Sequence, residues 1–124
     1  MQGQTNGMVH VLSRHSAGET LARLEAAIRA AGLTIFASIN QGGETGRASR
    51  LVIFGNPRAR ARLFEAAPTI ALDLPFRALV WEDARGRVRI SYDSPEYLRQ
   101  RHQAPADLAD QLAAIVPLVA DAAS

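Results

Sequence analysis

The residues that could do chemistry are few and lie far apart in the chain. They include His10, His15 and His102, and there is no cysteine. Disulfides, thiolate metal sites and cysteine nucleophiles are therefore excluded. No two histidines have the close spacing of a helical metal pair, although a carboxylate such as Glu19 could join two of them around a metal. Because His15 and His102 lie beside expected helix ends, where an imidazole can cap or stabilise the helix, we predict no metal site and no cofactor.

Five residues are the candidate ligand-binding positions. They are Asn56, Asp73, Trp81, Tyr92 and His102. Asp73 stands between two leucines and is expected to point inward, where a carboxylate requires hydrogen-bonding partners. Asn56 stands at an expected helix start, where free amides can bind a phosphate or a carboxylate, although capping alone explains an asparagine there. If Asp73, Tyr92 and His102 share a cleft, they could serve a small enzyme, which is the alternative function.

Several familiar motifs are absent from the sequence. The loop at 41–49 contains three glycines but lacks the lysine and the spacing of a phosphate-binding loop. No G-x-G-x-x-G and no G-x-S-x-G occurs. Glu82 and Asp83 are adjacent on an expected strand, so their side chains point to opposite faces and do not converge. These observations favour a non-enzymatic protein.

The charge pattern argues against nucleic-acid binding. The pI is 9.9, but the formal net charge is only +2, and all 14 cationic side chains are arginines. Two clusters stand out, namely Arg58, Arg60 and Arg62, and Arg85, Arg87 and Arg89. We interpret both as solvated faces rather than as an anion-binding surface, and aromatic residues make up only 6% of the chain. Nucleic-acid binding is therefore the second and less favoured alternative.

Length and composition indicate one globular domain. The chain has 124 residues, of which 48% are hydrophobic and 21% are charged, too apolar for intrinsic disorder. We expect a disordered leader over residues 1–8 and a single domain over 9–124. No apolar run approaches the ~20 residues of a membrane span, and the polar opening lacks the regions of a signal peptide. The expected location is cytoplasmic, with no membrane partner.

Hydrophobic periodicity, together with the residues that cap helices or favour turns, defines the expected helices and strands. Expected strands cover 9–13, 34–39, 51–54, 77–83 and 87–92, with a short extended segment at 70–74. Expected helices follow Ser16, Asn56 and Ser94, and a helical tail covers 105–124. Ser16 and Glu19 have the spacing of a capping box. Strands and helices do not strictly alternate, so the fold class is α+β, with two layers and a mostly antiparallel sheet.

The tail is expected to be ordered. It places Leu108, Leu112, Ile115 and Val119 on one stripe, and Pro117 is expected to kink it. A helix of this length is marginal in water, so the stripe needs a surface to cover. The chain's own sheet and a second subunit are both available, and we predict a homodimer to which the tail contributes.

Several strings of this sequence together resemble a known family. They are His15-Ser16-x-x-Glu19-Thr20, IFGNP at 53–57, ALDLP at 71–75 and VWED at 80–83. Over about residues 9–120 the chain resembles the bacterial and archaeal family called domain of unknown function 302. The resemblance implies helices packed on one face of an antiparallel sheet, with a topology similar to the TATA-box-binding-protein fold, and no established activity. The chain departs from the family pattern at Asn40-Gln41 and Arg60-Ala61, where the family usually has Asp-His and often has Gly-Thr.

Taken together, the sequence predicts a non-enzymatic module that binds a small ligand or another protein and acts as a homodimer. One face of the sheet is left without helices in such a fold and is available for a partner. The expected partners are a second copy and a small apolar or anionic ligand.

Overall fold

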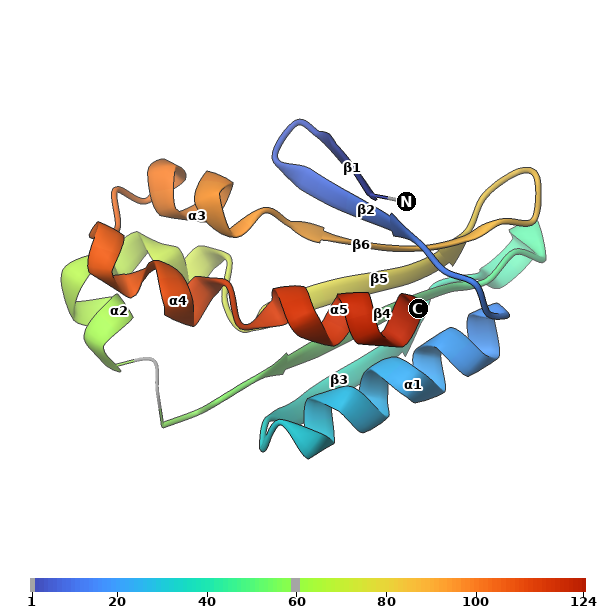
Figure 1. Ribbon diagram of the computed structural model, residues 1–124, viewed down its shortest axis with the longest axis horizontal. Coiled ribbons are helices and arrows are strands. Elements are labelled where there is room, and N and C mark those ends of the chain that lie inside the picture. The colour runs from blue at the N-terminus through green and yellow to red at the C-terminus, as the bar shows by residue number, and fades with distance from the viewer. Residues whose placement is uncertain (1, 59–60) are drawn as a thin grey trace.

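The protein folds as a six-stranded antiparallel sheet with helices on one side and at one end (Figure 1). The computed structural model describes residues 2–58 and 61–124. The strand order is β1-β2-β6-β5-β4-β3. The strands are β1 (Gln2–Thr5), β2 (Met8–Leu12), β3 (Thr34–Asn40), β4 (Ser49–Gly55), β5 (Phe76–Glu82) and β6 (Val88–Asp93). The α+β class and the antiparallel sheet predicted from the sequence are confirmed.

Five α-helices and three short 3₁₀ helices complete the described chain. The α-helices are α1 (Ala17–Ala30), α2 (Ala61–Ala66), α3 (Pro95–Arg101), α4 (Ala109–Leu112) and α5 (Ile115–Ala123). The 3₁₀ helices are η1 (Gly43–Thr45), η2 (Pro68–Leu72) and η3 (Ala106–Leu108). In Figure 1, α1 and α5 lie next to each other across the sheet, and α2, α3 and α4 gather beyond one end of it.

The main core lies between the sheet and the pair α1 and α5. Side chains alternate across a strand with period two, so one set from each central strand faces these helices. Val52 and Phe54 of β4 and Ala78 and Val80 of β5 are fully or almost fully buried. A second cluster at the end of the sheet joins α2, η2, α3 and α4, and its largest members are Leu63, Ile70, Leu98, Leu108 and Leu112.

Helix α1 begins where the sequence predicted. The Ser16 hydroxyl accepts a hydrogen bond from the Glu19 amide at 3.1 Å, which satisfies one of the free amides of the first turn. The Glu19 side chain lies 3.6 Å from the His15 Nδ1 atom. Leu24 and Ile28 of α1 are completely buried in the main core.

The tail is ordered and covers the chain's own sheet. Ile115, Leu118 and Val119 of α5 belong to the main core, so the stripe is buried within one subunit. The predicted kink lies before Pro117, between α4 and α5, because proline has no amide hydrogen to bond the carbonyl four residues back. The tail therefore covers the chain's own sheet, which is one of the two surfaces that the sequence allowed, the other being a second subunit.

Three segments differ from the sequence prediction. Within the leader that was expected to be disordered, Gln2–Thr5 form β1 and pair with β2. Asn6 and Gly7, with φ of 53° and 80°, make the tight turn that an Asn-Gly pair favours between antiparallel strands. The segment at 70–74 is not extended, because Pro68 opens η2 over Pro68–Leu72.

The helix expected after Asn56 is also shorter than predicted. Its described part is α2, over Ala61–Ala66, and Arg60 lies outside the described residues. The Asn56 Oδ1 atom accepts a hydrogen bond from the Arg58 amide at 2.9 Å and so closes a turn that precedes α2. Capping of a helix beginning at Pro57, as predicted for Asn56, is therefore not seen.

Candidate functional site

The face of the sheet turned away from α1 and α5 carries a group of apolar side chains. We call this surface the open face, and its apolar members are Met8, Leu12, Ile39, Leu51, Ile53, Leu79 and Trp81. The strand register places Leu51 between Ile39 and Leu79, so the group is continuous across β3, β4 and β5. Met8 and Ile39 remain 39% and 41% exposed. A shallow hollow of about 240 Å³ lies between Met8, Leu51 and Leu79, so solvent reaches the middle of this face.

The polar groups in the middle of the open face bond to one another. The Trp81 Nε1–H donates to the Ser91 hydroxyl at 2.8 Å. The same hydroxyl lies 2.7 Å from His10 Nδ1, and because its oxygen already accepts from Trp81, it can give its proton to that nitrogen. The indole and the serine therefore need no water to satisfy them, so the cost of covering this region is small.

The charged groups at the rim of the open face are paired. Asp83, in the hairpin after β5, binds the guanidinium groups of Arg87 and Arg89. Hydrogen bonds from the Arg87 amide and from the Arg89 guanidinium, against some desolvation, hold the pKa of Asp83 well below its usual range. The Arg89 guanidinium also lies over the Trp81 ring, 5.9 Å from its centre. Two of the three hairpin arginines thus share one carboxylate, and together the three groups keep a single positive charge.

Asp73 and His102 come together, as their grouping in the alternative function required. Both are buried, and His102 Nε2 lies 2.5 Å from Asp73 Oδ2. The carboxylate only accepts, so this nitrogen donates, and His102 Nδ1 accepts from the exposed Thr69 hydroxyl at 2.9 Å. Arg101 also bonds Asp73 Oδ2, at 2.8 Å. The inward-pointing Asp73 predicted from the sequence thus has the partners that a buried carboxylate needs.

Tyr92 does not join that pair. Its side chain belongs to the main core beneath α1 and α5, whereas Trp81 lies on the open face. Asn56 lies at the end of β4, beside a small apolar pocket. The five candidate residues predicted from the sequence therefore fall in four places, and only Asp73 and His102 contact each other.

Burial raises the pKa of Tyr92 above its usual value. The fold then favours the neutral phenol, so Tyr92 contributes stability that is present below its ordinary pKa of about 10 and is lost as pH rises through the folded value. The chain has two tyrosines, so a Tyr97→Phe variant leaves Tyr92 alone. We expect its tyrosinate absorbance to appear with a midpoint above pH ~10 and to coincide with loss of stability. A midpoint at or below that value would contradict the buried position.

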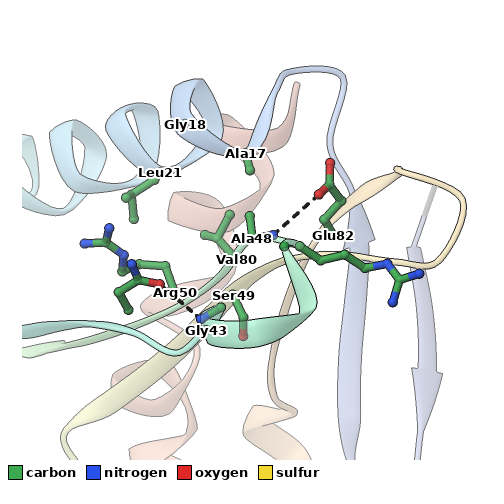
Figure 2. A pocket seen from close by; sticks show the side chains of 13 residues that line it. Ala17, Gly18, Leu21, Gly43, Ala48, Ser49, Arg50, Val80 and Glu82 are labelled. Atoms are coloured by element: carbon green, nitrogen blue, oxygen red, sulfur yellow. Dashed lines mark hydrogen bonds between the residues drawn. The ribbon is translucent and has the colours of Figure 1, made fainter.

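A larger pocket lies on the helix side of the sheet, beneath the first turn of α1 (Figure 2). Its volume is about 420 Å³, within the usual range for small-molecule sites. Leu21 of α1 and Val80 of β5 give it an apolar wall. Its charged lining residues are Arg50 of β4, Glu82 of β5 and Arg47 of the loop before β4. The glycine-containing loop between β3 and β4, which lacks a phosphate-binding motif, closes one side. The two-residue repeat of a strand could have identified Arg50 and Glu82 in the sequence. Arg50 is two residues from Val52 and Glu82 is two residues from Val80, so each shares a sheet face with an apolar neighbour.

The apolar pocket beside Asn56 holds about 150 Å³ and is lined by Leu63, Phe76 and Gln111 among others. The Gln111 Oε1 atom is buried and has no hydrogen-bond partner among the described residues. An unpaired buried oxygen costs about 1–3 kcal/mol.

Replacing this amide by an apolar side chain of similar shape should therefore stabilise the protein. For Gln111→Met we expect the free energy of unfolding, measured by urea denaturation, to rise by about 1 kcal/mol. A loss of similar size would mean that the amide does bond a partner in solution, such as a buried water.

The histidines do not form a metal cluster in the part of the chain that the structure describes. His10 bonds Ser91, His102 bonds Asp73, and His15 Nε2 lies 2.7 Å from the carbonyl oxygen of Ser124. No group of three or more metal-ligating side chains is found among residues 2–58 and 61–124. No described helix has the length and apolar character needed to cross a bilayer.

The architecture defines a two-layer α+β protein whose antiparallel sheet is covered by helices on one face. Its sequence matches the model of the family described as "Domain of unknown function DUF302" over residues 9–121. The chain belongs to this family. A crystal structure of an uncharacterized conserved DUF302 protein from Bacillus stearothermophilus is similar, with a TM-score of 0.76 over 96% of this chain and 97% of that one. At 20% sequence identity, that likeness shows the fold alone.

Longer relatives are also found among curated proteins. A protein of Brucella suis named fluoride-specific ion channel FluC 1 is 40% identical over 103 residues, which are 78% of this chain and 41% of that protein. A protein of the same name from Brucella abortus is 40% identical over the same length and is covered to 38%. The chain thus spans about two-fifths of the length of the curated relatives that it matches.

Proposed function

We propose that this protein is an interaction module that pairs two copies of the chain through the open face of the sheet. The observation that carries the proposal is the continuous apolar surface across β3, β4 and β5, with Leu51 in its middle and Leu79 and Trp81 on β5. A solvent-exposed apolar group of this kind usually marks a contact site. Fluoride conduction is a property in the name of the longer relatives, and the proposal does not depend on it.

The size of the open face supports a second copy as the partner. The sheet has six strands, and neighbouring strands lie about 4.8 Å apart. Its central strands β4 and β5 have seven residues each, at about 3.3 Å per residue. The face therefore covers about 550 Å², and two copies would bury about 1,100 Å², just above the ~1,000 Å² of a specific interface.

The charges of the open face also suit contact with an identical surface. A two-fold axis brings the same patch of each chain together, so a patch with net charge would repel itself. Here Arg77 lies 3.2 Å from Asp93, and Arg89 is paired with Asp83. With Arg87, which also binds Asp83, the rim has three arginines and two aspartates. Its net charge is therefore only +1, and its repulsion of an identical rim is weak. Two such sheets can pack face to face at about 10 Å, as in β-sandwiches.

The solution mass of a face variant and of a matched control tests the proposal. Leu79→Arg places a charge in the middle of the open face, and Leu72→Arg makes the same change on η2, where the leucine is 73% exposed. By light scattering we expect twice the one-chain mass of 13.4 kDa for the parent and for Leu72→Arg, and the one-chain mass for Leu79→Arg. If Leu79→Arg does not fold, Met8→Arg, at an exposed position of β2, replaces it. A parent of one-chain mass, or a face variant that keeps the double mass, would contradict the proposal.

A second candidate function is hydrolysis at Thr69, favoured by the chain of contacts from Thr69 through His102 to Asp73. With 2.9 Å and 2.5 Å between the bonding atoms, His102 Nδ1 could take the proton of the exposed Thr69 hydroxyl while Asp73 stabilises the imidazolium. The small enzyme predicted from the sequence included Tyr92, which lies in the core instead. Covalent labelling of the parent by a fluorophosphonate, lost in Thr69→Val, would support this function. No labelling would leave the network with a structural role.

A further inference from the structure

We infer that the pocket beneath α1 binds a small elongated molecule that carries an acid at one end and an amine at the other. The pocket lies on the helix side of the sheet, so this site is separate from the open face and does not depend on pairing of two chains. Three charged side chains line it, namely Glu82, Arg50 and the exposed Arg47 of the β3–β4 loop. None of the three has an ionic partner among the described residues, and the two that strands β4 and β5 hold in place are Arg50 and Glu82.

Arg50 supplies the positive end. It lies on the core-facing side of β4, because it is two residues before the buried Val52 and so shares its face. Its side chain is half-buried. Its guanidinium has one weak hydrogen bond, to the Ser38 hydroxyl at 3.4 Å. No carboxylate lies within ion-pair distance of it in the described chain. A partly desolvated guanidinium has five N–H donors in a planar fork that fits a carboxylate, so most of its capacity is free for a ligand.

Glu82 supplies the negative end. It is half-buried on the same side of β5 as Val80, and one of its oxygens accepts from the Ala48 amide at 3.4 Å. Within the described residues no cation lies close enough to form an ion pair with it. The carboxylate therefore keeps acceptor sites for an ammonium group.

The strand register separates the two charges. Arg50 is directly opposite Val80, and Glu82 is two residues further along β5, a diagonal position at which Cβ atoms lie about 7 Å apart. Figure 2 shows the Arg50 and Glu82 side chains on opposite sides of the pocket, with Val80 between them and Leu21 beside Arg50. The two groups consequently do not neutralise each other, and the space between them is apolar.

This arrangement selects the charges of the ligand and their spacing. A ligand with only a negative charge would bind Arg50 but be repelled by Glu82. A ligand with only a positive charge would bind Glu82 but be repelled by Arg50. An α-amino acid carries both charges on adjacent carbons and cannot span the pocket. An ω-amino carboxylate has an aliphatic chain between its two charges, which fits the wall of Leu21 and Val80.

Isomeric probes test the inference. The probe is 6-aminohexanoate, and its isomer 2-aminohexanoate has the same atoms but adjacent charges; hexanoate and hexylamine carry one charge each. By NMR titration of the full chain, followed at Leu21, Ala48 and Val80, we expect 6-aminohexanoate to bind at least ten-fold more tightly than each of the other three. Equal affinity for the two isomers, or no shift with any probe at tens of millimolar, would overturn the inference.

Charge-removing variants identify the two ends. We expect Arg50→Gln and Glu82→Gln each to weaken 6-aminohexanoate binding at least ten-fold, and Arg85→Gln, which removes the same charge from the exposed hairpin tip, to leave it unchanged. Arg50→Gln should strengthen hexylamine binding and Glu82→Gln should strengthen hexanoate binding, because each variant removes the charge that repels that probe. If Arg50→Gln does not fold, Arg50→Lys, which keeps the charge but loses the fork, should show a smaller loss. Pocket variants that bind as the parent does would contradict the assignment.

Discussion

Removing residues 114–124 is expected to unfold the chain. This deletion takes away α5, whose Ile115, Leu118 and Val119 fill the main core between the sheet and α1. Burial of one such side chain contributes about 1.5–3 kcal/mol, so three contribute about 5–9 kcal/mol, comparable with the total stability of a small domain. The truncated chain should show no cooperative melting transition by circular dichroism, whereas a truncated chain that melts like the parent would contradict this packing.

Single substitutions in α5 test the burial of its side chains without removing any backbone. Ile115→Ala should lower the free energy of unfolding by about 2–5 kcal/mol, because it leaves a cavity in a filled core. Val116, the next residue, is 39% exposed, so Val116→Ala is the matched control and should change stability by about 0.5 kcal/mol or less. Equal losses at both positions in urea denaturation would show that α5 does not present the face described here.

Asp73→Ala is expected to produce the second large loss of stability. This carboxylate accepts hydrogen bonds from His102 and Arg101, and its side chain is only 7% exposed. Removing it leaves the buried His102 Nε2–H without an acceptor and detaches Arg101 of α3 from the segment after η2. Breaking a buried pair of this kind costs about 3–5 kcal/mol, and we expect a loss near 3 kcal/mol since Arg101 remains half-exposed.

The control for this prediction is a second aspartate in an exposed pair. Asp107 lies 3.2 Å from Arg62, with both side chains largely exposed. An ion pair at the surface contributes about 0–1 kcal/mol, so Asp107→Ala should scarcely move the denaturation midpoint. If the Asp73 and Asp107 variants lose the same stability, burial does not decide the role of Asp73.

Local signals in the sequence were sufficient for most of the elements. The Ser16 and Ser94 caps, the continuous apolar run at 51–54 and the two neighbouring strand segments at 77–83 and 87–92 are local signals. Each acts over a few residues, so it predicts its element without knowledge of the fold. The Asn6-Gly7 turn was an equally local signal and was missed, because the polar leader around it carries no apolar alternation. The segment at 70–74 was misassigned since its helical conformation depends on packing of Ile70 in the second cluster.

The sites were less accessible to sequence reasoning because they depend on pairing between distant strands. Asp73 and His102 are 29 positions apart, and a buried carboxylate predicts that a partner exists but not which residue it is. Arg50 and Glu82 were not recognised together, since only the register of β4 with β5 places them in one pocket. Trp81 was selected as a binding residue, but its place on the open face and its bond to Ser91 follow from the sheet.

The exposure of Trp81 on dilution tests the central claim most directly. Trp81 is the only tryptophan of the chain and lies on the open face, so its fluorescence reports that surface alone. Acrylamide quenching and the sedimenting mass should be measured over the same range of protein concentration. We predict that the mass falls from two chains to one and that quenching of Trp81 increases over the same range. A one-chain mass throughout, or a mass that falls while Trp81 quenching stays constant, would contradict pairing through the open face.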